Sequence, residues 1–119
     1  MIIATISCGR EGEHMTMKLS GHAGAAEAGQ DIICASASII AYTVAQEAKN
    51  MESRHQLAEP PVIRMESGDA EISILPVNGS AYAEAFHTFY IAQVGYSLLA
   101  HNYPQYVELN VYNETEMQS

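Results

Sequence analysis

The fold is decided by Ile2-Ile3-Ala4-Thr5-Ile6-Ser7-Cys8, in which apolar side chains occupy alternate positions. Residues 2, 4, 6 and 8 would lie on one face of an extended chain and residues 3, 5 and 7 on the other, which is the period of a β-strand. Residues 15–20 alternate in the same way after a glycine-containing turn at 9–13. The two segments therefore predict an antiparallel hairpin at the start of the chain.

Two longer segments have the three- and four-residue spacing of amphipathic helices. The first helix is predicted from Asp31, as the N-cap, to about residue 50, and the second over residues 81–101. Apolar residues of the second helix cover more than one stripe, which suggests burial on two sides, one against the sheet and the other against a second subunit. The buried stripe predicted for the first helix is Ile33, Ala37, Ile40, Val44 and Ala48.

Short alternating segments at 62–65 and 71–75 predict a second hairpin, and residues 106–112 predict a final strand. The order β-β-α-β-β-α-β predicts an α+β fold of two layers, in which two helices pack on a mostly antiparallel sheet. We expect residues 1–113 to form a single domain and residues 114–119 to form a flexible tail.

The composition is typical of a compact soluble domain, with 48% hydrophobic and 16% charged residues in a chain of 119. No apolar run approaches the roughly 20 residues of a membrane span, and the first residues lack the basic start of a secretory signal. Two cysteines do not indicate a disulfide framework. We therefore expect a cytoplasmic protein with reduced thiols and no membrane partner.

The formal net charge is −9, from 14 acidic and 5 basic residues. Nucleic-acid binding needs clustered lysines and arginines, and those of this chain are scattered, so no direct nucleic-acid partner is expected. An acidic surface would instead attract a basic protein or peptide. The alternative is that the charge serves solubility alone.

Cys34 is the strongest candidate for a reactive group, because it follows the predicted start of the first helix closely. A thiol reacts as the thiolate, and a nearby imidazole or the positive end of a helix lowers the pKa of a thiol. With Asp31 as the N-cap, the Cys34 sulfur would lie in the first helical turn. Ser38, one turn later, could hydrogen-bond near the sulfur. The alternative is that Cys34 is a small buried hydrophobe.

His22 stands in Gly21-His22-Ala23-Gly24, where small neighbours would let a substrate approach the imidazole closely. As a general base, His22 would take the proton of Cys34, and as a general acid it would later protonate the leaving amine. Asp31 would act mainly as the helix cap, and orientation of His22 as a triad member is a lesser alternative. His22 could also be an ordinary exposed loop histidine.

No metal or cofactor site is predicted. The other histidines have no zinc-binding spacing, and the sequence contains no glycine-rich phosphate loop. Cys8 ends an alternating strand, so we expect it to pack rather than to react.

The paired segments Gly21-His22-Ala23 and Asp31-Ile32-Ile33-Cys34-Ala35, with Ser38, resemble the ribosomal-processing cysteine protease family, Prp. The resemblance implies a bacterial, cytoplasmic and homodimeric enzyme that removes the N-terminal extension of large-subunit ribosomal protein twenty-seven. It places the catalytic histidine of the family at His22 and the nucleophile at Cys34.

Two other functions are considered beside this one. A non-catalytic ribosome-associated binding or assembly factor would carry Cys34 only as a packing residue. A peroxide-reducing thiol protein would need a resolving cysteine, for which Cys8 is the only candidate in the sequence.

Overall fold

The computed structural model describes residues 1–22 and 28–113, with the backbone alone for residues 28–31. The predicted tail at 114–119 lies outside this part of the chain. The elements are β1 (Ile2–Cys8), β2 (Met15–Ser20), α1 (Ala28–Ser53), β3 (Val62–Glu66), β4 (Asp69–Ile74), α2 (Gly79–Asn102) and β5 (Val107–Asn113). The predicted order β-β-α-β-β-α-β and the α+β class are confirmed.

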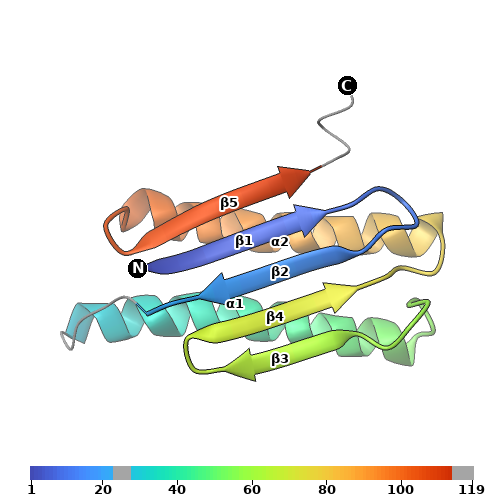
Figure 1. Ribbon diagram of the computed structural model, residues 1–119, viewed down its shortest axis with the longest axis horizontal. Coiled ribbons are helices and arrows are strands. Elements are labelled where there is room, and N and C mark those ends of the chain that lie inside the picture. The colour runs from blue at the N-terminus through green and yellow to red at the C-terminus, as the bar shows by residue number, and fades with distance from the viewer. Residues whose placement is uncertain (23–27, 114–119) are drawn as a thin grey trace.

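The sheet has five strands in the order β3-β4-β2-β1-β5. Every neighbouring pair is antiparallel except β1 and β5, which run parallel from the pairing of Ile2 with Val107. Both helices lie on the same face of the sheet, and within the described part of the chain the other face is left uncovered (Figure 1). The molecule therefore has two layers, with its core between the sheet and the helices.

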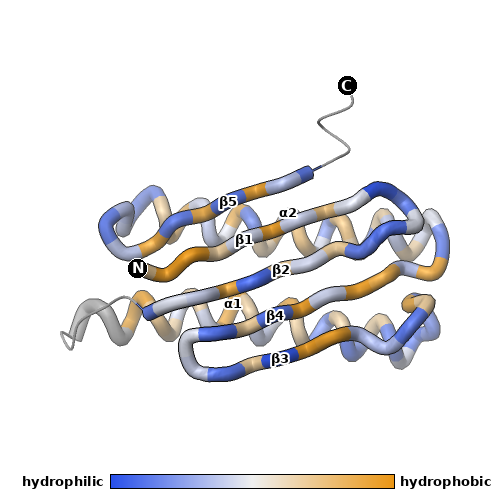
Figure 2. Tube along the Cα trace, viewed as in Figure 1, coloured by the Kyte–Doolittle hydropathy of each residue, from blue (hydrophilic) through white to orange (hydrophobic). Residues whose placement is uncertain are grey.

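Side chains alternate between the two faces of a β-strand, so every second residue of each strand points into this core. The apolar face predicted for β1 is confirmed, because Ile2, Ala4, Ile6 and Cys8 are all at most 5% exposed. Met15 and Met17 of β2 and Ile72 and Ile74 of β4 continue the same buried surface on the neighbouring strands. The turn between β1 and β2 is hydrophilic by comparison (Figure 2).

Helix α1 begins at Ala28, three residues before the predicted start. The prediction that Asp31 is the N-cap is therefore wrong, since Asp31 lies inside the helix. Alanine and glutamine at positions 28 and 30 favour helix and extend it upstream. The helix also runs on to Ser53, because the buried side chain of Met51 fixes its last turn to the core.

The predicted stripe of α1 faces the core: Ile33, Ala37, Val44 and Ala48 are buried, and Ile40 packs against them.

Helix α2 begins after Asn78, whose side-chain oxygen accepts a hydrogen bond of 2.9 Å from the backbone nitrogen of Ala81. Its buried side includes Phe89 and Tyr96. The buried Tyr96 hydroxyl donates a 3.0 Å hydrogen bond to the carbonyl oxygen of Ala37 in α1, and burial raises the pKa of this tyrosine. The opposite side of α2 is exposed, so the described residues of this chain cover one of the two predicted buried sides and leave the other open.

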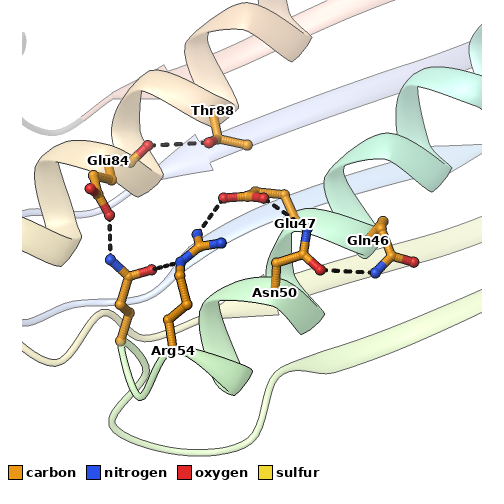
Figure 3. A network of polar contacts seen from close by, with 7 residues as sticks. Gln46, Glu47, Asn50, Arg54, Glu84 and Thr88 are labelled. Atoms are coloured by element: carbon orange, nitrogen blue, oxygen red, sulfur yellow. Dashed lines mark hydrogen bonds and ion pairs between the residues drawn. The ribbon is translucent and has the colours of Figure 1, made fainter.

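A polar network joins the C-terminal end of α1 to α2 (Figure 3). Arg54 donates to Glu47 at 2.7 Å and to the side-chain oxygen of Gln56 at 2.9 Å. Gln56 in turn donates to Glu84 on α2. The hydrogen bond from Arg54 is the main reason why the pKa of Glu47 lies below its ordinary value. This network fixes how the two helices lie relative to each other at one end of the molecule.

None of the helices in the described chain has the length and apolar content required to cross a membrane.

Candidate active site

Four of the predicted site residues line one cavity of about 310 Å³: Gly21, His22, Cys34 and Ser38. Gly21 and His22 directly follow β2, and Cys34 and Ser38 lie on successive turns of α1. Ala23 lies outside the described residues, and the same holds for the side chain of Asp31.

The backbone around His22 is held in place on both sides. Gly21 adopts a φ of +90°, and a Cβ there would lie 2.2 Å from the carbonyl oxygen of Met1, so only glycine fits. The Gly21 nitrogen donates to the carbonyl oxygen of Gly68 at 2.9 Å. The carbonyl oxygen of His22 accepts a 2.6 Å hydrogen bond from the nitrogen of Met1. These contacts place an exposed imidazole at the mouth of the cavity.

Cys34 is half-buried, and it lies in the second turn of α1 because the helix begins at Ala28. The unpaired N–H groups of a helix belong to its first four residues, and the effect of the helix dipole falls off within the first turn. The helix start therefore acts on Cys34 less than a cap at Asp31 would have allowed. The imidazole of His22, which lines the same cavity, is then the other group that can lower the pKa of a thiol.

Cys8 is the other thiol, and it is 5% exposed at the far end of β1. Desolvation by burial raises the pKa of Cys8 to about 11, so at neutral pH it is a protonated, packed side chain. Ile2 lines the cavity, and six steps along β1, about 20 Å of strand, separate Cys8 from it. This position is unsuited to a cysteine that resolves an oxidised Cys34.

The turn between β3 and β4 forms a wall of the cavity that the sequence analysis missed. Glu66, Ser67, Gly68 and Asp69 all line it. Hydrogen bonds from the Arg64 guanidinium to Asp69 and to Glu71 raise the pKa of Arg64. In the sequence these residues resemble any hairpin turn, and only the pairing of β4 with β2 brings them beside His22.

Among the side chains that the structure describes, those of residues 1–22 and 32–113, no three from histidine, cysteine, aspartate or glutamate are grouped to hold an ion. The cavity thus offers a thiol and an imidazole among small, acidic and large apolar residues, the last of which include Leu19 and Met65. This set can support nucleophilic attack by sulfur with proton transfer by the imidazole.

Several solved structures share this fold. The ribosomal processing protease Prp of Staphylococcus aureus, with a covalently linked product peptide, is 25% identical with a TM-score of 0.68, and the match covers 93% of this chain and 99% of that one. The same protease with a substrate peptide is 23% identical with a TM-score of 0.64 over 93% and 99% of the two chains. A Streptococcus mutans protein is 24% identical with a TM-score of 0.65 over 95% of both chains.

No curated protein sequence matches the chain. The family model described as cysteine protease Prp, however, matches residues 1–108, which include both hairpins, both helices and every residue of the cavity. A thiol and an imidazole at one cavity are the groups that such a protease requires. The chain therefore belongs to the Prp family of cysteine proteases.

Proposed function

We propose that Cys34 is the nucleophile and His22 the general acid and base of a ribosomal-protein processing reaction. The observation that supports this assignment is that both side chains line the same cavity of about 310 Å³. Cys34 is half-buried and His22 is exposed, so a peptide could reach both side chains from solvent.

The proposed reaction has two steps. The Cys34 sulfur, deprotonated by His22, attacks the scissile carbonyl carbon, and a thioester forms as the C–N bond breaks. The imidazolium gives its proton to the leaving amine. His22 then removes a proton from a water molecule, which hydrolyses the thioester and releases the new carboxylate and the Cys34 thiol.

We propose the N-terminal extension of large-subunit ribosomal protein twenty-seven as the substrate. Membership of the Prp family supports this choice, as do the peptide complexes of the Staphylococcus aureus protease. The net charge of −9 also supports it, because an acidic enzyme attracts a basic ribosomal protein and increases the association rate. The reaction would take place in the cytoplasm.

We also propose that the enzyme is a homodimer. The outer side of α2 carries large apolar side chains in contact with solvent, among them Ile91 and Leu98, which are 55% and 59% exposed. A second copy would cover such a surface without any change to the core.

The test is cleavage of the N-terminally extended ribosomal protein, followed by mass spectrometry. Cys34→Ala should give no cleavage, and His22→Ala should lower kcat by about 10²- to 10⁴-fold, the usual contribution of a general acid and base. His14→Ala is the matched control, because it removes an exposed histidine that pairs with Glu59 and does not line the cavity.

Cleavage by Cys34→Ala at the wild-type rate would reject the mechanism. Absence of cleavage by the wild-type protein itself would instead favour a non-catalytic ribosome-associated binding factor.

A further inference from the structure

The β3–β4 turn contacts the segment of His22 at two points. The two strands pair from Glu66 with Asp69, so the turn itself consists of Ser67 and Gly68. The carbonyl oxygen of Gly68 accepts the hydrogen bond from Gly21, the residue before His22. Gly68 also lies directly beneath the imidazole of His22.

The approach of the imidazole to Gly68 is closer than any side chain would permit. A Cβ at Gly68 would lie 2.4 Å from Nε2 of His22 and 2.8 Å from Cε1, well inside van der Waals contact. The imidazole can take its observed position only because the α-carbon beneath it carries no side chain. Gly68 also has a φ of +74°, which disfavours other residues for a separate reason.

We propose that Gly68 is a positioning residue for His22. It provides the surface on which the imidazole rests, and the turn thereby sets the place of the ring relative to Cys34 across the shared cavity. Proton transfer depends strongly on that placement, because a displacement of about 1 Å can cost about 10²-fold in rate. The proposal rests on the proposed catalytic role of His22.

Backbone strain and contact with the ring must be separated in the test, and the chain offers a matched control. Gly12, in the β1–β2 turn, has a φ of +90°, but a Cβ there would meet nothing within 4 Å. Gly12→Ala therefore introduces the backbone strain alone. Gly68→Asn introduces the contact with little of the strain, since asparagine tolerates a left-handed backbone but still brings a Cβ against His22.

The experiment measures Tm, kcat, KM and the pH dependence of kcat/KM for these variants on the extended ribosomal protein. Gly68→Ala and Gly68→Asn should both lower kcat by about 10- to 100-fold and shift the limb of the pH profile that His22 controls. Gly12→Ala should keep kcat within about twofold of the wild-type value. Its Tm should fall by at least as much as that of Gly68→Asn.

A second measurement does not depend on activity. The ring signals of His22 in an NMR titration should move in both Gly68 variants and stay unchanged in Gly12→Ala. The double variant His22→Ala/Gly68→Ala should recover Tm relative to Gly68→Ala, because the ring that clashes with the new methyl group is gone.

Wild-type kcat in Gly68→Asn, or unchanged His22 ring signals in it, would overturn the proposal and leave the proposed function intact. Wild-type activity in His22→Ala would instead reject the proposed function, while the ring signals would still report the contact. If Gly68→Ala fails to fold, Gly68→Asn and the double variant decide between contact and strain.

Discussion

Burial separates the two cysteines chemically, although both are free thiols. Cys8 is surrounded by the core, and loss of hydration raises its pKa to about 11. Cys34 lines a cavity that opens to solvent beside an exposed imidazole. At the scale of single residues, access to water and to a proton acceptor therefore decides which sulfur can react.

This difference predicts selective alkylation. At about pH 7.5, iodoacetamide should label each folded chain once, at Cys34, because the thiolate is the reactive form and Cys8 is both protonated and inaccessible. Peptide mapping by mass spectrometry checks the position of the label. Cys34→Ala should remain unlabelled until urea unfolds it, and labelling of Cys8 in the native protein would contradict the prediction.

At the scale of elements, the end of α1 is joined to α2 by a chain of polar contacts as well as by packing (Figure 3). Glu47 and Arg54 form an ion pair at 2.7 Å, with 33% and 48% of their side chains exposed. Arg54 also donates a hydrogen bond to Gln56, which in turn donates one to Glu84 on α2. Protonation of Glu47 therefore weakens one end of the chain of polar contacts between the two helices.

The acid dependence of stability follows from this pair. The folded-state pKa of Glu47 is lowered, mainly by the hydrogen bond from Arg54. The ionised Glu47 side chain therefore stabilises the fold fully above the ordinary glutamate pKa of about 4.3. This stabilisation is lost as the pH falls through the lower, folded-state pKa. An exposed pair of this kind contributes about 0.2–1 kcal/mol.

Glu47→Gln should thus lower the free energy of unfolding by that amount at pH 7 and by less near pH 3, as urea denaturation at both pH values will measure. Glu52→Gln is the matched control: it removes one charge from the same exposed end of α1, away from this ion pair. A destabilisation by Glu47→Gln that is equally large at pH 3 would contradict the role of the ion pair.

At the scale of the whole molecule, both helices lie on one face of the sheet, so their outer sides form the opposite surface (Figure 1). That surface carries Ile39 of α1, which is 61% exposed, and the exposed apolar residues of α2. Between the helices it contains a largely apolar cavity of about 480 Å³, lined by Ile40 and Ile91 among others. Apolar patches of this kind mark interaction sites more often than free surface.

The proposed homodimer is tested through this surface. Sedimentation equilibrium should find the wild-type protein as a dimer, and Ile91→Lys with Leu98→Lys should make it monomeric, because two charges cannot be buried there without partners. Val62→Lys is the control, since Val62 is 54% exposed on β3, away from the helices. A monomeric wild-type protein, or a dimer that tolerates both lysines, would contradict this arrangement.

The sequence by itself determined the type and order of the elements and the inward face of β1, because a period of two or of three to four residues is a local property. It also identified His22 and Cys34 as the two candidate reactive residues, and it placed both beside small neighbours.

Only the tertiary structure decided where α1 begins and which hairpin completes the cavity. Alanine and glutamine before Asp31 extend the helix, and no periodic signal marked its first residue. Gly68 reaches His22 because β4 pairs with β2, and strand pairing between segments about fifty residues apart depends on the packing of the whole sheet. The candidate reactive residues could therefore be read from the sequence, whereas the surface against which the imidazole rests required the assembled fold.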